Sequence, residues 1–209
     1  MNKRINTDIE PEKLPLVEEF FSLQGEGYHT GKAAYFIRLG GCDVGCSWCD
    51  SRFSWNPAIH PMVETEVIIN NVINSGTDSV VVTGGEPLMW NLDLLCSGLK
   101  KKNINTFIET SGAYPLSGEW DWICLSPKKN MPPVDHITNI ANELKVIIQD
   151  ENDFEWAEKF KSRVSSECIL FLQPEWSRFK IIIPRIVEYV KSHPTWRVSL
   201  QAHKYMHIP

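Results

Sequence analysis

The chain has 209 residues, of which 43% are hydrophobic and 22% charged, and its formal net charge at pH 7 is -5. These values fit a globular protein with a sizeable core, and we expect one domain over residues 1–209 with a flexible N-terminal extension at residues 1–15. The negative charge gives no basis for a nucleic-acid interface, and no segment is apolar over the length that crosses a bilayer. We therefore expect no nucleic-acid partner, no membrane partner and a cytoplasmic location.

Apolar segments that favour strands alternate with amphipathic segments that favour helices. The pattern predicts strands at residues 33–41, 104–110, 142–149, 168–174 and 196–201. It also predicts a strand in residues 78–87 that stops at the double glycine, and a strand followed by a loop in residues 121–129. It predicts helices at residues 65–75, 92–102, 153–164 and 178–192. Short apolar strands with helices between them indicate a parallel sheet with crossover helices. About six or seven strands are fewer than the eight of a complete barrel, so we expect an α/β fold of the open or partial (β/α) barrel type.

Many of the predicted strands run into polar segments that contain glycine, proline or both. These segments are RLGGC, VVVTGGEP, FIETSG, CLSPKK, FLQPEW and SLQAHK. Ligands bind where the carboxyl ends of parallel strands gather, so segments far apart in the sequence would meet at one site. This convergence predicts an enzyme.

Three of the six cysteines, Cys42, Cys46 and Cys49, are spaced as C-x3-C-x2-C. The cytoplasm keeps thiols reduced, which argues against disulfides and for metal binding where cysteines cluster. A structural zinc site needs four ligands, and His60 or a distant cysteine is a candidate for the fourth. Three cysteines packed beside a tight turn are a further alternative. The remaining cysteines, Cys96, Cys124 and Cys168, lie among apolar residues and are expected to be buried hydrophobic side chains.

An iron-sulfur cluster gives the three-cysteine pattern a chemical purpose. Such clusters are commonly held by four thiolates, so three would leave one iron open to another ligand. The amino and carboxylate groups of S-adenosylmethionine form a suitable chelating pair, and radical reactions are carried out by cofactors of this kind.

Together with GGEP at residues 84–87, the cysteine motif resembles the radical S-adenosylmethionine superfamily, in which an aromatic residue such as Trp48 often precedes the last cysteine. Eight motifs in order, FSLQGEG, FIRLGGC, CSWCDS, TGGEP, ETSG, LSPK, LQP and SLQAHK, resemble the 7-carboxy-7-deazaguanine synthase family. The resemblance implies a carbon–nitrogen lyase of queuosine and 7-deazapurine biosynthesis. Members convert 6-carboxy-5,6,7,8-tetrahydropterin to 7-carboxy-7-deazaguanine and ammonia, using S-adenosylmethionine, a 4Fe-4S cluster and Mg²⁺.

The resemblance also implies a role for individual residues. The 4Fe-4S ligands are Cys42, Cys46 and Cys49. The substrate contacts are Leu23, Gln24, Gly25, Arg38, Thr83 and the α-carboxylate of Pro209. The S-adenosylmethionine contacts are Gly85, Ser126, Pro127, Lys128, Gln173, Pro174, Glu175 and Trp176. A guanidinium suits a substrate carboxylate, although Arg38 also fits a surface ion pair, and Pro209 also fits a frayed terminus. His203 and Lys204 belong to the SLQAHK motif, but the sequence assigns them no separate chemistry.

The chain departs from the family at residue 51. The family usually has threonine two residues after the last cysteine, where its hydroxyl binds Mg²⁺, and this chain has Ser51. Serine keeps the oxygen and loses only a methyl group, so we expect Ser51 to bind Mg²⁺. The family further implies a homodimer and an electron donor such as flavodoxin or ferredoxin.

Two alternatives remain at this point. A glycyl-radical activase shares the small size, the cysteine spacing and GGEP, but it must accept a protein loop, whereas QGEG, SLQAHK and the terminal proline favour a pterin. An iron-sulfur electron-transfer module or a zinc-stabilised binding protein would account for the cysteines but not for the polar strand ends.

Overall fold

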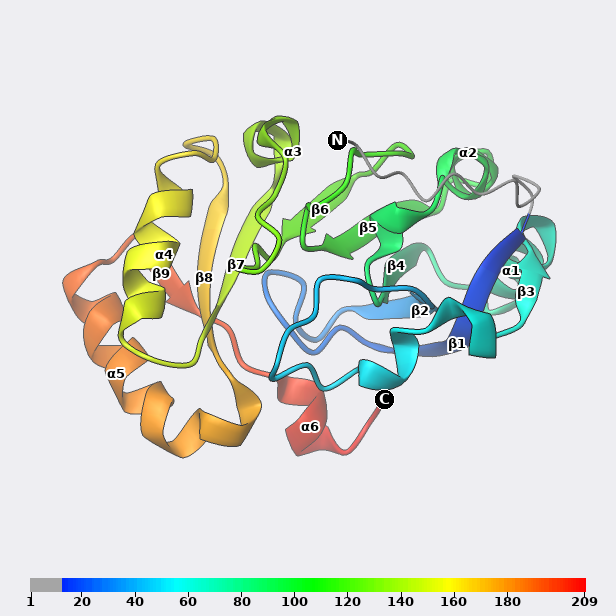
Figure 1. The fold of residues 1–209 in the computed structure, drawn as a ribbon. Helices are drawn as coiled ribbons and strands as arrows, with labels where there is room; N and C mark the ends of the chain where they lie inside the picture. Colours follow the sequence, from blue (N-terminus) through cyan, green and yellow to red (C-terminus); the bar gives the residue numbers. More distant parts are fainter. Residues whose placement is uncertain (1–12) are drawn as a thin grey trace.

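The computed structural model describes residues 13–209. These residues form one sheet of nine strands in the order β3-β1-β2-β4-β5-β6-β7-β8-β9 (Figure 1). The run from β2 to β9 is parallel, whereas β1 pairs antiparallel with both β2 and β3. The strands are β1 (Lys13–Leu23), β2 (Ala33–Leu39), β3 (Met62–Glu64), β4 (Ser79–Gly84), β5 (Asn105–Thr110), β6 (Trp122–Leu125), β7 (Glu143–Ile148), β8 (Ile169–Pro174) and β9 (Trp196–Val198).

Of the six helices in residues 13–209, five lie around the outside of the curved sheet, and the sixth lies near the C-terminus on the opposite side (Figure 1). The outer helices are α1 (Thr65–Asn74), α2 (Asp93–Lys100), α3 (Asp135–Ile140), α4 (Asn152–Lys161) and α5 (Phe179–Ser192), and the sixth is α6 (Ala202–Met206). Short 3₁₀ turns are η1 (Arg52–Ser54), η2 (Pro57–Ile59), η3 (Pro87–Met89) and η4 (Trp176–Arg178). In residues 13–209 no helix combines the length and apolar character needed to cross a bilayer.

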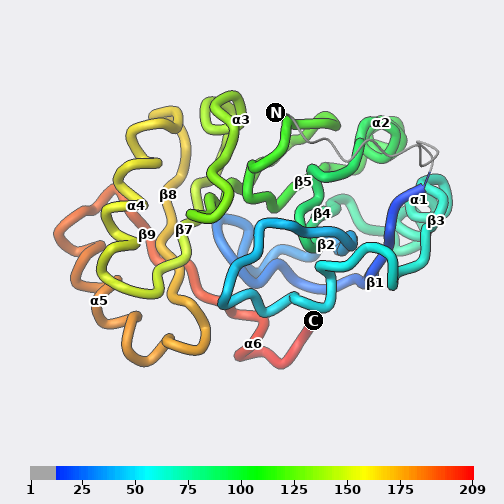
Figure 2. The backbone as a smooth tube through the Cα atoms, in the orientation of Figure 1, coloured from blue at the N-terminus to red at the C-terminus, as the bar shows by residue number. Residues whose placement is uncertain are grey.

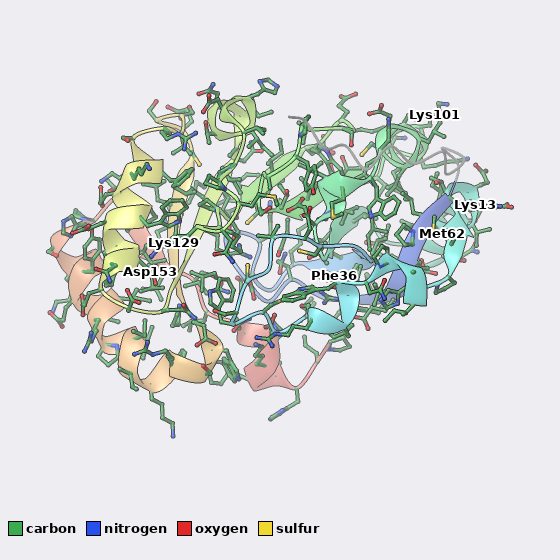
Figure 3. The ribbon with its side chains drawn as sticks, in the orientation of Figure 1. Lys13, Phe36, Met62, Lys101, Lys129 and Asp153 are labelled. Atoms are coloured by element: carbon green, nitrogen blue, oxygen red, sulfur yellow. The ribbon has the colours of Figure 1, made fainter. Side chains whose placement is uncertain are left out.

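The two faces of the sheet have different roles because successive side chains of a strand point to opposite faces. In β7, Leu144, Val146 and Ile148 belong to the large core that packs against the helices. Glu143 and Lys145 alternate with them and so face the interior of the partial barrel. A second, smaller cluster fills part of that interior with Ala34, Phe36, Val81 and Phe107, and Figure 3 shows Phe36 near the middle of the view.

The predicted fold class is confirmed, and the seven strands predicted for the parallel run all form. The antiparallel strands β1 and β3 were not predicted, nor were α3 and α6. The expected extension is wrong for residues 13–15, because they begin β1 and pair with residues 62–64. Residues 1–12 lie outside the described part of the chain.

Candidate active site

A cavity of about 290 Å³ opens at the carboxyl ends of the parallel strands. Seventeen of the eighteen site residues predicted from the sequence line it: Leu23, Gln24, Gly25, Arg38, Cys42, Cys46, Cys49, Ser51, Thr83, Gly85, Ser126, Lys128, Gln173, Pro174, Glu175, Trp176 and Pro209. The exception is Pro127, which is buried and does not line the cavity. The structure therefore brings together segments from nearly the whole chain.

The cysteine loop is held by hydrogen bonds to its own backbone and to distant segments. The Cys42 amide donates to the Trp55 carbonyl at 3.1 Å, and the Cys49 amide donates to the Cys46 carbonyl at 3.2 Å. The Tyr114 hydroxyl donates to Asp43 Oδ2 at 2.6 Å. These bonds fix a loop whose three free thiols are all half-buried.

Burial disfavours the thiolate forms that bind a metal. It raises the pKa of Cys42 to about 11 and also raises that of Cys46, so metal charge is needed to favour the thiolates. Among the described residues no three His, Cys, Asp or Glu side chains are grouped closely enough to hold a single ion. His60, the proposed fourth zinc ligand, instead bonds through Nε2 to the Phe53 carbonyl at 2.9 Å and does not line the cavity.

The GGEP turn packs directly against the backbone that begins the cysteine loop. The Gly85 amide donates to the Leu39 carbonyl at 2.9 Å, and the Glu86 amide donates to the Gly41 carbonyl at 2.8 Å. A Cβ on Gly85 would lie 2.2 Å from the Gly41 oxygen, and one on Gly84, whose φ is 141°, would lie 2.2 Å from the Leu39 oxygen. Both glycines therefore allow two backbone segments to touch.

The side chain of Glu86 ties this turn to the end of β5. It is 1% exposed and accepts hydrogen bonds from the Leu88 amide at 3.1 Å and the Ser111 amide at 2.7 Å. The hydroxyls of Thr110 and Ser111 donate to the same carboxylate. The glutamate of GGEP therefore has a structural role, because its buried carboxylate accepts these hydrogen bonds. A buried carboxylate without such partners would cost free energy.

The QGEG loop and the C-terminal segment form another wall. The Ala202 amide donates to the Gly25 carbonyl at 2.8 Å, and a Cβ on Gly25 would lie 2.2 Å from His203 Nδ1. Pro209 lies close to β1, where the Ser22 hydroxyl donates to its oxygen at 3.4 Å. Figure 2 shows the C-terminal end beside the loop that follows β2. Pro209 therefore reaches the cavity.

Charged and polar residues that the sequence did not assign also line the cavity. They include Glu26, Asp50, Glu86, Glu109, Lys145, Gln201 and His203. Lys145 is the most informative of these, because a lysine in the middle of the apolar strand β7 is unusual unless its charge is paired. It lies 2.6 Å from Glu26 Oε2 and 3.3 Å from Glu109 Oε2.

Comparison with known proteins identifies the family. Residues 36–138 match the radical SAM superfamily. The chain is 55% identical over 210 residues to the 7-carboxy-7-deazaguanine synthase of Flavobacterium psychrophilum, covering 100% of both chains. It is 46% identical to that of Synechocystis sp., covering 93% of both. The crystal structure of QueE from Escherichia coli superimposes with a TM-score of 0.82 at 29% identity, covering 97% of this chain and 99% of that one. The chain belongs to the 7-carboxy-7-deazaguanine synthase family.

Membership favours the synthase interpretation over a glycyl-radical activase or a non-catalytic module, because the similarity to synthases extends over the full length. Membership of the radical SAM superfamily also implies a 4Fe-4S cluster and S-adenosylmethionine. The three half-buried thiols and the adjoining glycine turn fit these two groups.

In this synthase family member, the segments predicted to bind S-adenosylmethionine are preorganised. Lys128 Nζ donates to both the carbonyl and the hydroxyl of Ser126 at 2.6 Å and lies 5.7 Å from the centre of the Trp48 ring. Burial lowers the pKa of Lys128. On β8, Gln173 Oε1 accepts from the Ser199 hydroxyl at 2.7 Å. Trp176 is 40% exposed, so it forms part of the rim of the cavity.

Arg38 and Thr83 are neighbours in the register of β2 and β4. The Arg38 Nε donates to Glu18 Oε1 at 2.7 Å, so the ion pair considered from the sequence is present. Arg38 lines the cavity as well. Because the pair uses Nε, it orients the outer part of the guanidinium.

Ser51 lies beside Asp50 at the mouth of the cavity. Its hydroxyl is 3.3 Å from Asp50 Oδ1, and Lys204 Nζ is 2.9 Å from Asp50 Oδ2. Burial alone would raise the pKa of Asp50, but its hydrogen bond and charge interaction with Lys204 outweigh that effect and lower it. Two oxygen-bearing side chains thus adjoin the last cysteine. Oxygen is the ligand that Mg²⁺ prefers.

Proposed function

We propose that the protein converts 6-carboxy-5,6,7,8-tetrahydropterin to 7-carboxy-7-deazaguanine with release of ammonia, in the biosynthesis of queuosine and related 7-deazapurines. The observation that carries the proposal is that one cavity is lined by the three cysteines, the GGEP turn and the C-terminal proline. Family membership at 55% identity over the whole chain supports the same reaction.

The lining of this cavity supports an assignment of the cofactors to individual residues. Cys42, Cys46 and Cys49 hold the 4Fe-4S cluster, and S-adenosylmethionine contacts Gly85 and the segments 126–128 and 173–176. When bound, the two cofactors would supply the radical chemistry needed to remove a hydrogen atom from C6 of the substrate. The protein orients the substrate for this step and excludes water and other hydrogen donors. Lys128 is held by Ser126, lies over the Trp48 ring and lines the cavity together with Cys46.

The substrate is bound by groups of complementary chemistry. The outer guanidinium nitrogens of Arg38 bind the substrate carboxylate, because a planar guanidinium pairs with a carboxylate through two hydrogen bonds. The pterin ring is surrounded by Leu23, Gln24, Gly25 and Thr83. The Pro209 carboxylate accepts hydrogen bonds from N–H groups of the pterin.

Adding a few glycine residues after Pro209 is expected to raise KM about tenfold or more, because the terminal carboxylate is moved away from the substrate. The same residues added at the N-terminus serve as the matched control. Steady-state kinetics with the two proteins would measure the difference. An unchanged KM in the C-terminally extended protein would contradict the role of Pro209.

We assign Mg²⁺ to Ser51. Ser51→Ala is expected to raise the Mg²⁺ concentration needed for half-maximal activity about tenfold or more, since one oxygen ligand is lost. Ser51→Thr retains the hydroxyl and is expected to keep the Mg²⁺ response. Titration of activity with Mg²⁺ compares the two variants with the wild type. Identical curves for Ser51→Ala and the wild type would place the metal elsewhere.

The remaining assignments follow from the same reaction. A low-potential electron donor such as flavodoxin or ferredoxin supplies the electron, and the working form is a homodimer. The free thiols of the chain suit the reducing cytoplasm.

The direct test is anaerobic incubation of the cluster-loaded protein with a reductant, S-adenosylmethionine, Mg²⁺ and 6-carboxy-5,6,7,8-tetrahydropterin. We expect 7-carboxy-7-deazaguanine and ammonia in equal amounts, measured by mass spectrometry and an ammonia assay. A fully loaded protein that cleaves S-adenosylmethionine but makes no 7-carboxy-7-deazaguanine would refute the proposal.

A further inference from the structure

A buried group of three charges lies in the wall of the cavity. Lys145 is 4% exposed, and its Nζ lies 2.6 Å from Glu26 Oε2 and 3.3 Å from Glu109 Oε2. The three residues come from different parts of the fold: Glu26 from the loop after β1, Glu109 from β5 and Lys145 from β7. All three line the cavity, so the lysine joins two otherwise separate segments at the site.

The second oxygen of each carboxylate is held by an amide side chain. Glu26 Oε1 accepts from Gln201 Nε2 at 2.9 Å, and Glu109 Oε1 accepts from Gln24 Nε2 at 2.8 Å. The Gln24 oxygen in turn accepts from the Glu26 amide at 3.1 Å. Gln24 and Gln201 also line the cavity. Both carboxylates are therefore fixed in position at both oxygens, with lone pairs left over for a ligand, because an ionised carboxylate has about four acceptor sites.

Charge interactions favour the ionised forms of Glu26 and Lys145. Burial alone would raise the pKa of Glu26, but the charge and hydrogen bond of Lys145 outweigh it and lower the pKa to about 2. Burial alone would likewise lower the pKa of Lys145, and the acidic groups around it raise it well above its usual value. Two negative charges against one positive charge leave this wall negative. Other titratable groups that act on these three residues are Cys124, Glu143, Lys128, Asp50 and His203.

We propose that Lys145 is a positioning residue for the substrate, which holds Glu26 and Glu109 in place as hydrogen-bond acceptors for the N–H groups of the pterin ring. The inference rests on the proposed function and adds a residue to it. A tetrahydropterin carries a 2-amino group and N–H groups on both rings, so it needs acceptors. Lysine offers only donors, so its effect on the ring is exerted through the two carboxylates.

The test is the affinity for 6-carboxy-5,6,7,8-tetrahydropterin, measured by anaerobic calorimetry on cluster-loaded protein with S-adenosylmethionine present and no reductant. Lys145→Met is expected to bind the substrate at least about tenfold more weakly at neutral pH, because the two carboxylates repel each other and lose their orientation. The affinity of the variant should also fall more steeply than that of the wild type as the pH is lowered from about 8 to about 6. Without the lysine, burial raises the pKa of Glu26, and protonation of that carboxylate removes an acceptor as the pH falls.

Lys101→Met is the matched control, because it makes the same chemical change at an exposed residue far from the cavity (Figure 3). It is expected to bind with wild-type affinity and pH dependence. Iron content and a thermal melt establish that each variant is folded and loaded. If Lys145→Met does not fold, Lys145→Gln, an uncharged polar replacement, is expected to show the same loss of affinity and the same pH dependence.

A folded, loaded variant that lacks Lys145 but binds with wild-type affinity and pH profile would overturn the inference and leave the proposed function standing. A wild-type protein that does not bind the tetrahydropterin at all would instead refute the proposed function, and the inference with it.

Discussion

Cys46→Ala is expected to abolish turnover and to leave a folded protein that cannot retain a 4Fe-4S cluster. The cluster is bound by only three thiolates, so the loss of one leaves too few protein ligands to hold it. The fold should survive because Cys46 is a half-buried loop residue and its replacement costs about 1 kcal/mol or less. Iron and sulfide content after anaerobic reconstitution, the visible absorption spectrum and product formation measure the three parts of the prediction.

Cys168→Ala is the matched control. Cys168 is 7% exposed and belongs to the core between the sheet and the helices, and it does not line the cavity. Its replacement should lower the free energy of unfolding by about 1 kcal/mol while cluster content and activity stay at wild-type levels. A Cys46→Ala protein that retains four irons and makes product would show that this cysteine is not a ligand.

The parallel part of the fold is predictable from the sequence, and the antiparallel part is not. Strands such as β4 and β7 are continuous apolar segments bounded by turns, as strands covered by helices should be. The segment that forms β1 mixes apolar residues with Glu18 and Glu19 and has a register shift near Leu16, so it shows no regular alternation. Strand β3 has only three residues, which carry no periodic signal at all.

The candidate site likewise has parts that the sequence predicts and parts that it does not. The cysteine loop and GGEP are each contained in one short segment, so their spacing identifies them. The charged group of Lys145, Glu26 and Glu109 is assembled by the barrel from three segments, and no spacing predicts it. Its one local signal is a lysine between Leu144 and Val146, because a charge in a buried strand requires a partner.

The two glycines of GGEP have a physical explanation in the structure. Gly84 and Gly85 let the turn approach the backbone of residues 39–41, and both line the cavity. The turn and the cysteine loop are therefore a single packed unit.

Gly85→Ala is accordingly expected to damage the cysteine loop without touching a cysteine. The new Cβ would lie 2.2 Å from the Gly41 oxygen and 2.8 Å from the Cys42 Cβ, distances that real structures do not tolerate. Because the obstructing atoms are mostly backbone, the clash can be removed only if the GGEP turn and the cysteine loop move apart. Their separation weakens the bonds from the Gly85 and Glu86 amides. We expect a loss of about 1–3 kcal/mol in the free energy of unfolding and a large loss of bound iron.

Gly98→Ala separates this steric effect from the general cost of adding a methyl group. A Cβ on Gly98, in α2, would lie 2.3 Å from Ile69 Cδ1, which is the movable end of a side chain rather than backbone. Alanine is favoured over glycine in a helix interior by about 1 kcal/mol, which offsets the cost of moving Ile69. Gly98→Ala should therefore keep near wild-type stability and a full cluster, as judged by denaturant unfolding and iron analysis. Equal iron retention in the two variants would mean that the contact between Gly85 and Gly41 does not shape the cysteine loop. A loss of bound iron in Gly85→Ala alone would establish that GGEP supports the cluster ligands through backbone packing.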